Sequence, residues 1–186
     1  EVFLGFDFYG AGNVGDDLMI AGFLKGLAAK QNYNLTCCIP PERVYAQKQR
    51  FPEIRWISAS TEERVSLINR SDLWLGVGGT PFQAVGGKWL LKRIVADYES
   101  CPNVPKWMIG VGCEKEVVNE LEFAKYIVDR TERIWSRDNA SRSVLLNELE
   151  ASEDRVLSGG DLAHIFLEKT MPVSEERDRT GSSLGL

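Results

Sequence analysis

Short apolar segments alternate with longer amphipathic segments along almost the whole chain, and this alternation restricts the fold more than any other feature. Seven apolar segments have the length of buried strands: residues 2–7, 35–39, 54–58, 73–77, 107–111, 134–136 and 155–158. Six segments between them have helical periodicity: residues 17–30, 41–50, 61–69, 88–99, 117–129 and 140–149. Because helices connect successive strands, we predict a Rossmann-like α/β fold, a parallel sheet of about seven strands with helices on both faces.

Residues that favour helix N-termini support this division of the chain. Asp16 precedes the first predicted helix and Asp138 precedes the last, and a side-chain oxygen at such a position can accept a hydrogen bond from a free backbone N–H.

Beyond Met171 the composition turns polar and offers almost nothing to bury. We therefore predict one domain over residues 1–169, followed at residues 170–186 by a linker or the start of a C-terminal domain.

Charge and hydropathy argue against two classes of protein. The net charge is −5 and the basic residues are scattered, so no basic stripe predicts nucleic-acid binding. No segment approaches the ~20 apolar residues of a membrane span. The first residues have the pattern of a strand and lack that of an export signal. We therefore expect a cytoplasmic protein, located in the cytoplasm itself or peripherally at the inner membrane face.

The cysteines and histidine do not predict a metal site. Cys37, Cys38, Cys101 and Cys113 have no C-x-x-C spacing, and His164 is the one histidine in the chain. Adjacent cysteines in an apolar segment are typical of free thiols on a strand, which fits a reducing compartment. We expect no metal and no bound cofactor.

Glycine and polar residues gather in the loops that lead from a strand to the next helix. Five such loops are unusual, and they cover residues 9–17, 76–83, 110–112, 136–141 and 158–161. In an open parallel sheet these loops all lie at the carboxyl edge, where helix N-termini present free N–H groups and a partial positive charge. The sequence therefore predicts a binding site for a small anionic ligand at this edge.

The first of these loops matches the pattern G-x-G-x-x-G at Gly10, Gly12 and Gly15. A dinucleotide site also needs an acidic residue at the end of the second strand, and that strand ends at Ile39-Pro40 without one. Asn13 and Asp16 suit sugar hydroxyls better than phosphate, and we assign Gly12, Asn13 and Gly15 to substrate binding. The alternative is that Asn13 and Asp16 only shape the turn and cap the helix.

Arg137 is the residue that most strongly indicates function. It follows a strand directly, and a guanidinium can grip a carboxylate or phosphate with two parallel hydrogen bonds. Asp138 and Ser141 belong to the same strand-to-helix segment, and we place Arg137, Asp138 and Asp16 among the catalytic candidates and Ser141 among the binding residues. The alternative is a helix cap at Asp138 with Arg137 paired to a surface acid.

The remaining binding candidates are glycines and two polar residues. Gly78, Gly79 and Gly112 allow close backbone approach to a ligand, although tight packing of neighbouring loops would explain them equally. Gln83 offers a hydrogen-bonding amide, with a solvated surface position as the alternative. Asp161 follows two glycines at the end of the last strand, where a turn is the alternative role. We interpret His164 as structural.

In their order and spacing, these motifs resemble those of the polysaccharide pyruvyl transferase family, including exopolysaccharide pyruvyltransferases of the succinoglycan type. The resemblance extends over nearly the whole chain, to about residue 168. The motifs that carry it are Gly12-Asn13-Val14-Gly15-Asp16-Asp17, Gly76-Val77-Gly78-Gly79 with Phe82-Gln83, Gly110-Val111-Gly112, Ser136-Arg137-Asp138 with Ser141, and Gly160-Asp161.

The resemblance implies a bacterial enzyme of exopolysaccharide biosynthesis with two Rossmann-like domains arranged as in GT-B glycosyltransferases. Such an enzyme moves a pyruvyl group from phosphoenolpyruvate to a sugar of a surface polysaccharide or its precursor, free or linked to a lipid, and forms a ketal. This chain would correspond to the N-terminal half. Two alternatives remain open: a GT-B-like glycosyltransferase that uses a nucleotide sugar, and a sugar-binding module without catalytic activity.

Overall fold

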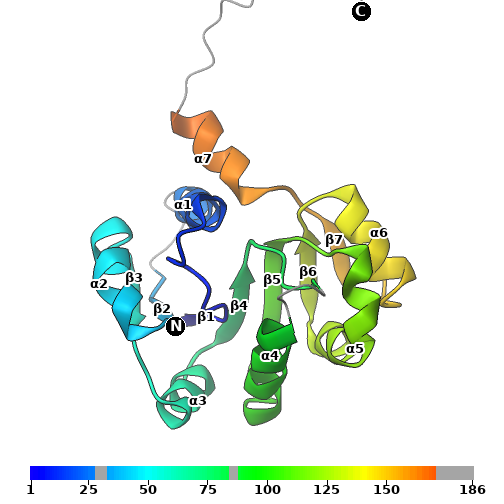
Figure 1. Cartoon of the computed structure of the whole chain (residues 1–186), viewed down its shortest axis with the longest axis horizontal. Coiled ribbons are helices and arrows are strands. Elements are labelled where there is room, and N and C mark those ends of the chain that lie inside the picture. The colour runs from blue at the N-terminus through cyan, green and yellow to red at the C-terminus, as the bar shows by residue number, and fades with distance from the viewer. Residues whose placement is uncertain (28–32, 84–87, 171–186) are drawn as a thin grey trace, which may run out of the picture.

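The strands pair into one sheet in which every neighbouring pair is parallel (Figure 1). The computed structural model describes residues 1–27, 33–83 and 88–170. Within these ranges the strand order is β3-β2-β1-β4-β5-β6-β7. The strands are β1 Val2–Leu4, β2 Leu35–Cys38, β3 Ile54–Ile57, β4 Leu73–Val77, β5 Lys106–Val111, β6 Arg133–Ser136 and β7 Val156–Ser158. The predicted Rossmann-like α/β architecture is confirmed.

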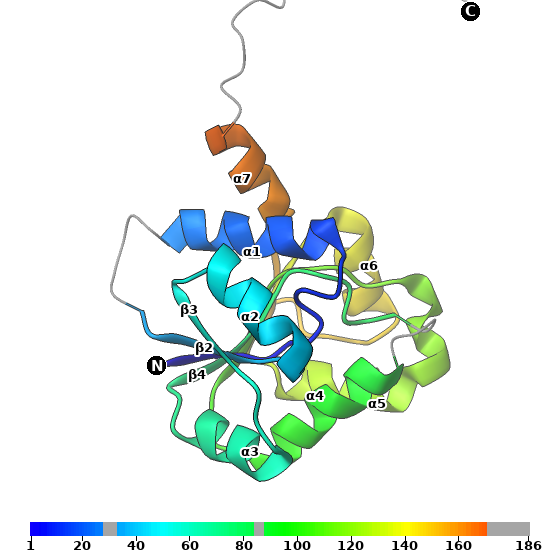
Figure 2. The ribbon, with the colours of Figure 1, turned by 60° about the vertical axis from the view of Figure 1, so that its left-hand side comes forward.

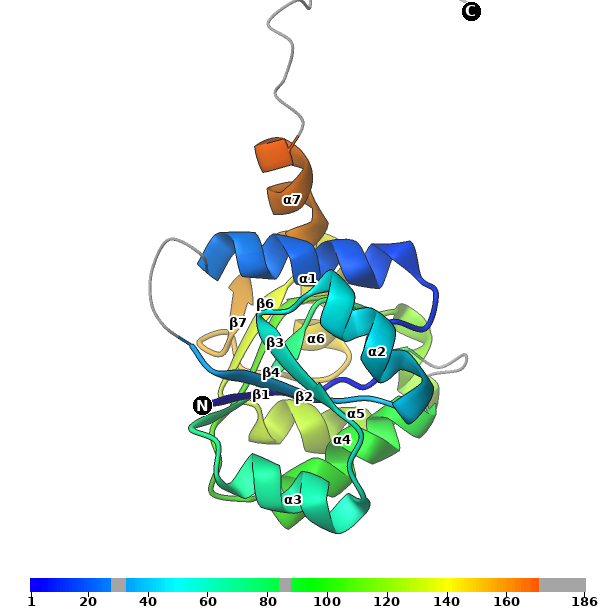
Figure 3. The ribbon, with the colours of Figure 1, turned by 90° about the vertical axis from the view of Figure 1, so that its left-hand side faces the viewer.

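Helices connect the strands, as their amphipathic patterns predict. They are α1 Val14–Leu27, α2 Pro41–Arg50, α3 Thr61–Asn69, α4 Lys88–Ser100, α5 Leu121–Arg130, α6 Asn139–Asn147 and α7 Leu162–Thr170, with a 3-10 helix η1 at Lys115–Glu120. Figures 1 and 3 show α1 over one face of the sheet and α3, α4 and α5 over the other. Residues 28–30 of the first predicted helix and residues 171–186 of the predicted linker lie outside the described residues.

Two of the predicted helices need correction, and one helix was missed. The first helix begins at Val14, so Asp16 lies inside its first turn and does not precede it. The helix predicted at 117–129 is divided between η1 and α5. The helix α7 was not predicted, although Leu162, Ile165 and Phe166 have helical spacing. This helix has only nine residues, and so short an apolar pattern is a weak signal for a helix.

The helix α7 owes its position to a glycine on α1. A Cβ atom at Gly22 would lie 1.8 Å from the carbonyl oxygen of Leu162, so only glycine allows the two helices to approach this closely. The Lys25 ammonium also lies 4.5 Å from the ring centre of Phe166. Figures 2 and 3 show α7 against the outer side of α1, extending away from the sheet. The packing of α7 therefore fixes where the segment after β7 leaves the sheet.

The core contains an ion pair between two helices on the same face of the sheet. Arg64 on α3 and Asp97 on α4 are each only 3% exposed, and the Arg64 Nε and Nη2 atoms donate to the two Asp97 oxygens at 2.8 and 2.6 Å. Trp74 Nε1 donates to the same carboxylate at 3.0 Å, and Arg64 Nη2 donates to the Gly5 carbonyl at 2.7 Å. Burial lowers the pKa of Arg64, but hydrogen bonding to Asp97 and its charge outweigh burial and raise it. This network joins α3 and α4 to β4 and to the segment that directly follows β1.

The strand order places a topological switch point between β1 and β4. From β1 the chain proceeds outward to β2 and β3, and from β4 it proceeds the other way to β5, β6 and β7. The loops after β1 and β4 therefore diverge, and the crevice between them is the usual ligand site of a doubly wound sheet.

Candidate functional site

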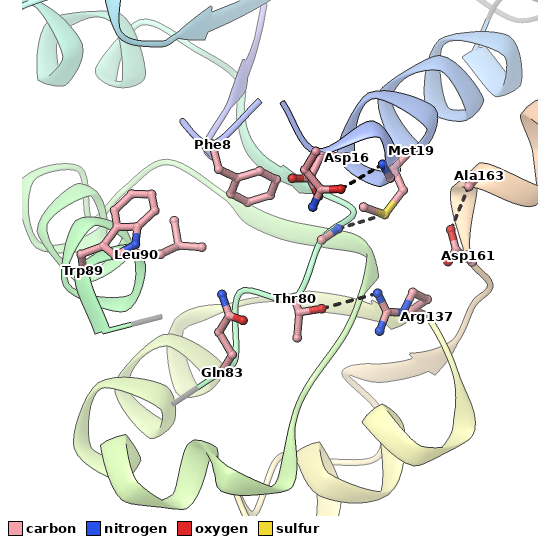
Figure 4. A pocket seen from close by; sticks show the side chains of 13 residues that line it. Phe8, Asp16, Met19, Thr80, Gln83, Trp89, Leu90, Arg137, Asp161 and Ala163 are labelled. Carbon is pink, nitrogen blue, oxygen red and sulfur yellow. Dashed lines mark hydrogen bonds between the residues drawn. The ribbon is translucent and has the colours of Figure 1, made fainter. Parts of the chain in front are cut away.

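A cavity of about 320 Å³ lies at the carboxyl edge of the sheet, at this switch point (Figure 4). Its walls come from the loops after β1, β4, β6 and β7 and from the N-terminal turns of α1, α4 and α7. The lining residues are Phe8, Asn13, Gly15, Asp16, Met19, Gly79, Thr80, Gln83, Trp89, Leu90, Arg137, Asp161 and Ala163. The volume is at the lower end of the range for small-molecule sites.

Arg137 places a cation at one side of the cavity. It follows β6 directly, and its backbone N–H donates to the Val111 carbonyl at 2.8 Å, which ties it to the end of the neighbouring strand. Its Nη1 atom lies 3.4 Å from Thr80 Oγ1, and its Nε atom lies 3.3 Å from Asp138 Oδ2. Both contacts are long, so they leave donor capacity of the guanidinium for a ligand. The side chain is 30% exposed.

Asp138 and Ser141 build the loop and do not line the cavity. Asp138 is the N-cap of α6, because its Oδ1 atom accepts a 2.7 Å hydrogen bond from the Ser141 backbone. That bond, together with the nearby Arg137, lowers the pKa of Asp138, so this carboxylate stays ionised. Ser141 is buried, and its hydroxyl accepts a hydrogen bond from the Cys113 backbone at 3.0 Å. The structure therefore gives Asp138 the capping role stated above as an alternative.

Asp16 is the acidic group of the cavity whose environment is most unusual. It is 9% exposed, on the first turn of α1, and it lines the cavity. Burial and the neighbouring Asp17 carboxylate raise the pKa of Asp16 to about 6, although a hydrogen bond with Asn13 acts in the opposite direction. Asp17 itself is paired with Arg50 and accepts a hydrogen bond from Gln47 at 3.2 Å. Asp16 can therefore exchange a proton close to neutral pH.

The first loop holds Asn13 and Gly15 at the cavity through a short turn. Asn13 Oδ1 accepts a hydrogen bond from the Gly15 N–H at 3.0 Å. Gly12 has a φ of 90° and does not line the cavity. A Cβ atom at Gly12 would meet no atom within 4 Å, so its backbone conformation and not lack of space favours glycine there.

The other predicted glycines divide between the cavity wall and the packing behind it. Gly79 lines the cavity, has a φ of 71° and directs its N–H toward Met19 Sδ at 3.0 Å. Gly78 packs against the same methionine and does not line the cavity. Gly112 lies behind the Arg137 side chain, where a Cβ atom would be 2.8 Å from Nη2.

Gln83 and Asp161 complete the predicted residues at the cavity. The Gln83 side chain is half-buried, and Figure 4 shows its amide pointing into the cavity. Asp161 Oδ1 accepts a hydrogen bond from the Ala163 N–H at 2.9 Å, which satisfies a free donor at the start of α7. His164 is exposed and does not line the cavity.

Sequence reasoning did not select six of the lining residues: Phe8, Met19, Thr80, Trp89, Leu90 and Ala163. Thr80 lies within the glycine-rich loop of residues 76–83, so the sequence itself indicates its place at the cavity. Trp89 gave no comparable signal, because an aromatic residue at the start of an amphipathic helix is typical of core packing. Only the orientation of α4 places it at the cavity.

The described residues include no group of three or more His, Cys, Asp or Glu side chains that could hold a metal ion. The four cysteines are buried free thiols. No helix in the described ranges has the length and apolar character required to cross a membrane.

Comparison with models of known protein families gives no match, and comparison with curated proteins and with solved structures gives none either.

Proposed function

We propose that this chain is the phosphoenolpyruvate-binding domain of a polysaccharide pyruvyl transferase. One observation carries the proposal: Arg137 and Asp16 line the same small cavity. The guanidinium N–H groups of Arg137 make only long hydrogen bonds within the protein, and the pKa of the Asp16 carboxyl group is raised to about 6. The order of the loop motifs, which resembles that of the family, supports the proposal independently.

The charges of the donor substrate match this cavity. Phosphoenolpyruvate carries a carboxylate and a phosphate, and either group fits the planar fork of Arg137. The Thr80 hydroxyl adds a neutral donor at the cavity wall. Holding phosphoenolpyruvate by such groups fixes its orientation relative to the acceptor.

The reaction requires movement of two hydroxyl protons. One sugar hydroxyl adds to C2 of phosphoenolpyruvate while C3 takes up a proton and becomes a methyl group. A second hydroxyl then replaces the phosphate at C2, and the C–O bond to phosphate breaks with its electron pair on the phosphate oxygen. Ionised Asp16 can accept the proton of an attacking hydroxyl, because its raised pKa makes it a stronger base than an ordinary aspartate.

A nucleotide sugar fits the cavity less well. Its diphosphate would be expected at the N-terminus of α1, as in other doubly wound folds. Asp16 places a carboxyl group in that first turn, where its negative charge opposes a diphosphate at the helix end, whereas the charge of Asp17 is neutralised by Arg50. This arrangement favours the pyruvyl transferase over the glycosyltransferase alternative.

Thermal unfolding distinguishes the two donors, because a ligand that binds only the folded state raises the midpoint. We expect millimolar phosphoenolpyruvate to raise the unfolding temperature, and equimolar pyruvate with inorganic phosphate to raise it less. A rise with uridine diphosphate glucose and none with phosphoenolpyruvate would overturn the proposal.

A further inference from the structure

Trp89 is an exposed aromatic residue at the wall of the cavity. It is the second residue of α4, and 53% of its surface is exposed, whereas the next three apolar positions on the core face of this helix, Leu90, Leu91 and Ile94, are buried. The helix therefore packs on the sheet without help from Trp89. Figure 4 shows the indole on the side of the cavity opposite Arg137.

Phe8 continues the same wall. Its ring is stacked with Phe6, with 5.2 Å between ring centres, and its centre lies 4.8 Å from that of Tyr9. Phe6 and Tyr9 are fully buried, so they hold the Phe8 ring in place. The cavity thus has one aromatic wall, formed by Phe8 and Trp89, and one wall carrying the cation of Arg137.

We propose that Trp89 and Phe8 form the subsite for the acceptor sugar, with one face of a pyranose ring stacked on the indole and Gln83 hydrogen-bonded to its hydroxyls. This inference rests on the proposed function for the identity of the bound sugar as an acceptor. It adds two residues, Trp89 and Phe8, that the sequence motifs do not contain.

The chemistry of the two walls supports this division. A pyranose face presents several C–H groups, which are attracted to the electron-rich face of an indole, while its rim carries hydroxyls that need hydrogen-bond partners. The amide of Gln83 can donate and accept. In the view of Figure 4, Asp16 lies between the aromatic wall and Arg137. A hydroxyl of a stacked sugar would meet phosphoenolpyruvate at this place.

Saturation-transfer NMR with the methyl pyranosides of glucose, galactose and mannose tests the subsite. The variants are Trp89→Ala, Trp89→Phe and a matched control, Trp107→Ala. Trp107 is also exposed, at 37%, but it does not line this cavity. We expect Trp89→Ala to weaken binding of at least one pyranoside by about fivefold, and Trp89→Phe and Trp107→Ala to change it by less than about twofold.

Three results would overturn the inference: no pyranoside binding to the wild-type chain, equal affinity in Trp89→Ala, or an equal loss in Trp107→Ala. Uridine is titrated in parallel, because bases also stack on tryptophan. Loss of uridine binding in Trp89→Ala with unchanged pyranoside binding would assign the wall to a base and overturn the inference as well.

Calorimetric titration of the same variants with phosphoenolpyruvate separates this inference from the proposed function. We expect the phosphoenolpyruvate affinity of Trp89→Ala to stay within about twofold of the wild type. Absence of phosphoenolpyruvate binding to the wild type would refute the proposed function, whatever the pyranosides do. Normal phosphoenolpyruvate binding with unchanged pyranoside affinity in Trp89→Ala would refute the sugar subsite alone.

Discussion

The guanidinium of Arg137 lies against the backbone of Gly112, so close that a Cβ atom there would be 2.8 Å from Nη2 and 3.0 Å from Cζ. Thr80 Oγ1 would be 2.9 Å away on the same side. Gly112 therefore provides the space in which Arg137 reaches the cavity. Its φ is not positive, so alanine at this position would conflict with neighbouring atoms and not with backbone conformation.

Gly112→Ala is expected to displace the Arg137 guanidinium and to weaken phosphoenolpyruvate binding by about threefold to tenfold. Calorimetric titration measures the change. Gly26→Ala is the control, because a Cβ atom at Gly26 meets no atom within 4 Å. Unchanged affinity in Gly112→Ala would show that the position of the guanidinium does not govern binding.

Asp16→Asn is expected to stabilise the fold near neutral pH. The pKa of Asp16 in the folded state is raised to about 6, compared with about 3.9 in an unfolded chain. Between these values the folded state binds the proton more readily, so this group's contribution to stability falls as pH rises from about 4 to about 6 and stays low above that. Asparagine carries no charge at any pH, so the variant does not lose this stability as the pH rises.

Unfolding in urea at pH 4 and pH 8 measures the effect. We expect Asp16→Asn to raise the free energy of unfolding at pH 8 by about 1 kcal/mol more than at pH 4, allowing for screening by solvent in the open cavity. Asp129→Asn makes the same change of charge at an exposed site on α5 and serves as the control. Equal effects of Asp16→Asn at both pH values would contradict the raised pKa.

The buried pair of Arg64 and Asp97 predicts strongly non-additive effects on stability. Asp97→Leu alone leaves the Arg64 guanidinium buried without its counter-ion, which costs about 3 to 5 kcal/mol. Arg64→Met alone similarly leaves the Asp97 carboxylate buried without its counter-ion. The double variant replaces both charges with apolar groups and is expected to be less destabilised than the sum of the two single variants. Urea unfolding of all four proteins tests this, and additive effects would argue against direct coupling.

Gly22→Ala is expected to separate α7 from α1, because the added methyl group would lie 1.8 Å from the Leu162 carbonyl oxygen. Amide hydrogen exchange should become faster in α7 and remain slow in the central strands. Gly26→Ala in the same helix is the matched control. Unchanged exchange in α7 would mean that the two helices can shift to accept the methyl group.

The sequence predicted the parallel sheet and much of the cavity from one relationship. Strand-to-helix loops of a parallel sheet share one edge. The sequence alone therefore places five polar residues at the same edge: Asn13, Asp16, Gln83, Arg137 and Asp161. The same rule could not separate residues that face the cavity from those that support it. Asp138 illustrates this, because a capping residue and a catalytic acid look alike in the sequence.

Long-range packing accounts for what sequence reasoning missed. Arg64 and Asp97 are far apart in the chain, and each lies in an amphipathic helix where a charged residue is normally solvated. Their pairing depends on how α3 and α4 pack side by side beneath the central strands. Trp89 depends in the same way on the orientation of α4, which periodicity alone does not determine.

Calorimetric titration of phosphoenolpyruvate into the wild-type chain, Arg137→Lys and Arg133→Lys tests the central claim most directly. The two arginines lie at opposite ends of β6, and Arg133 is exposed and donates to the Asp154 carbonyl at 2.7 Å, away from the cavity. Lysine keeps the charge but lacks the planar fork. We predict at least a tenfold loss of affinity in Arg137→Lys, about 1.4 kcal/mol, and no change in Arg133→Lys. Equal affinity in all three proteins would contradict the assignment of Arg137 to the donor site.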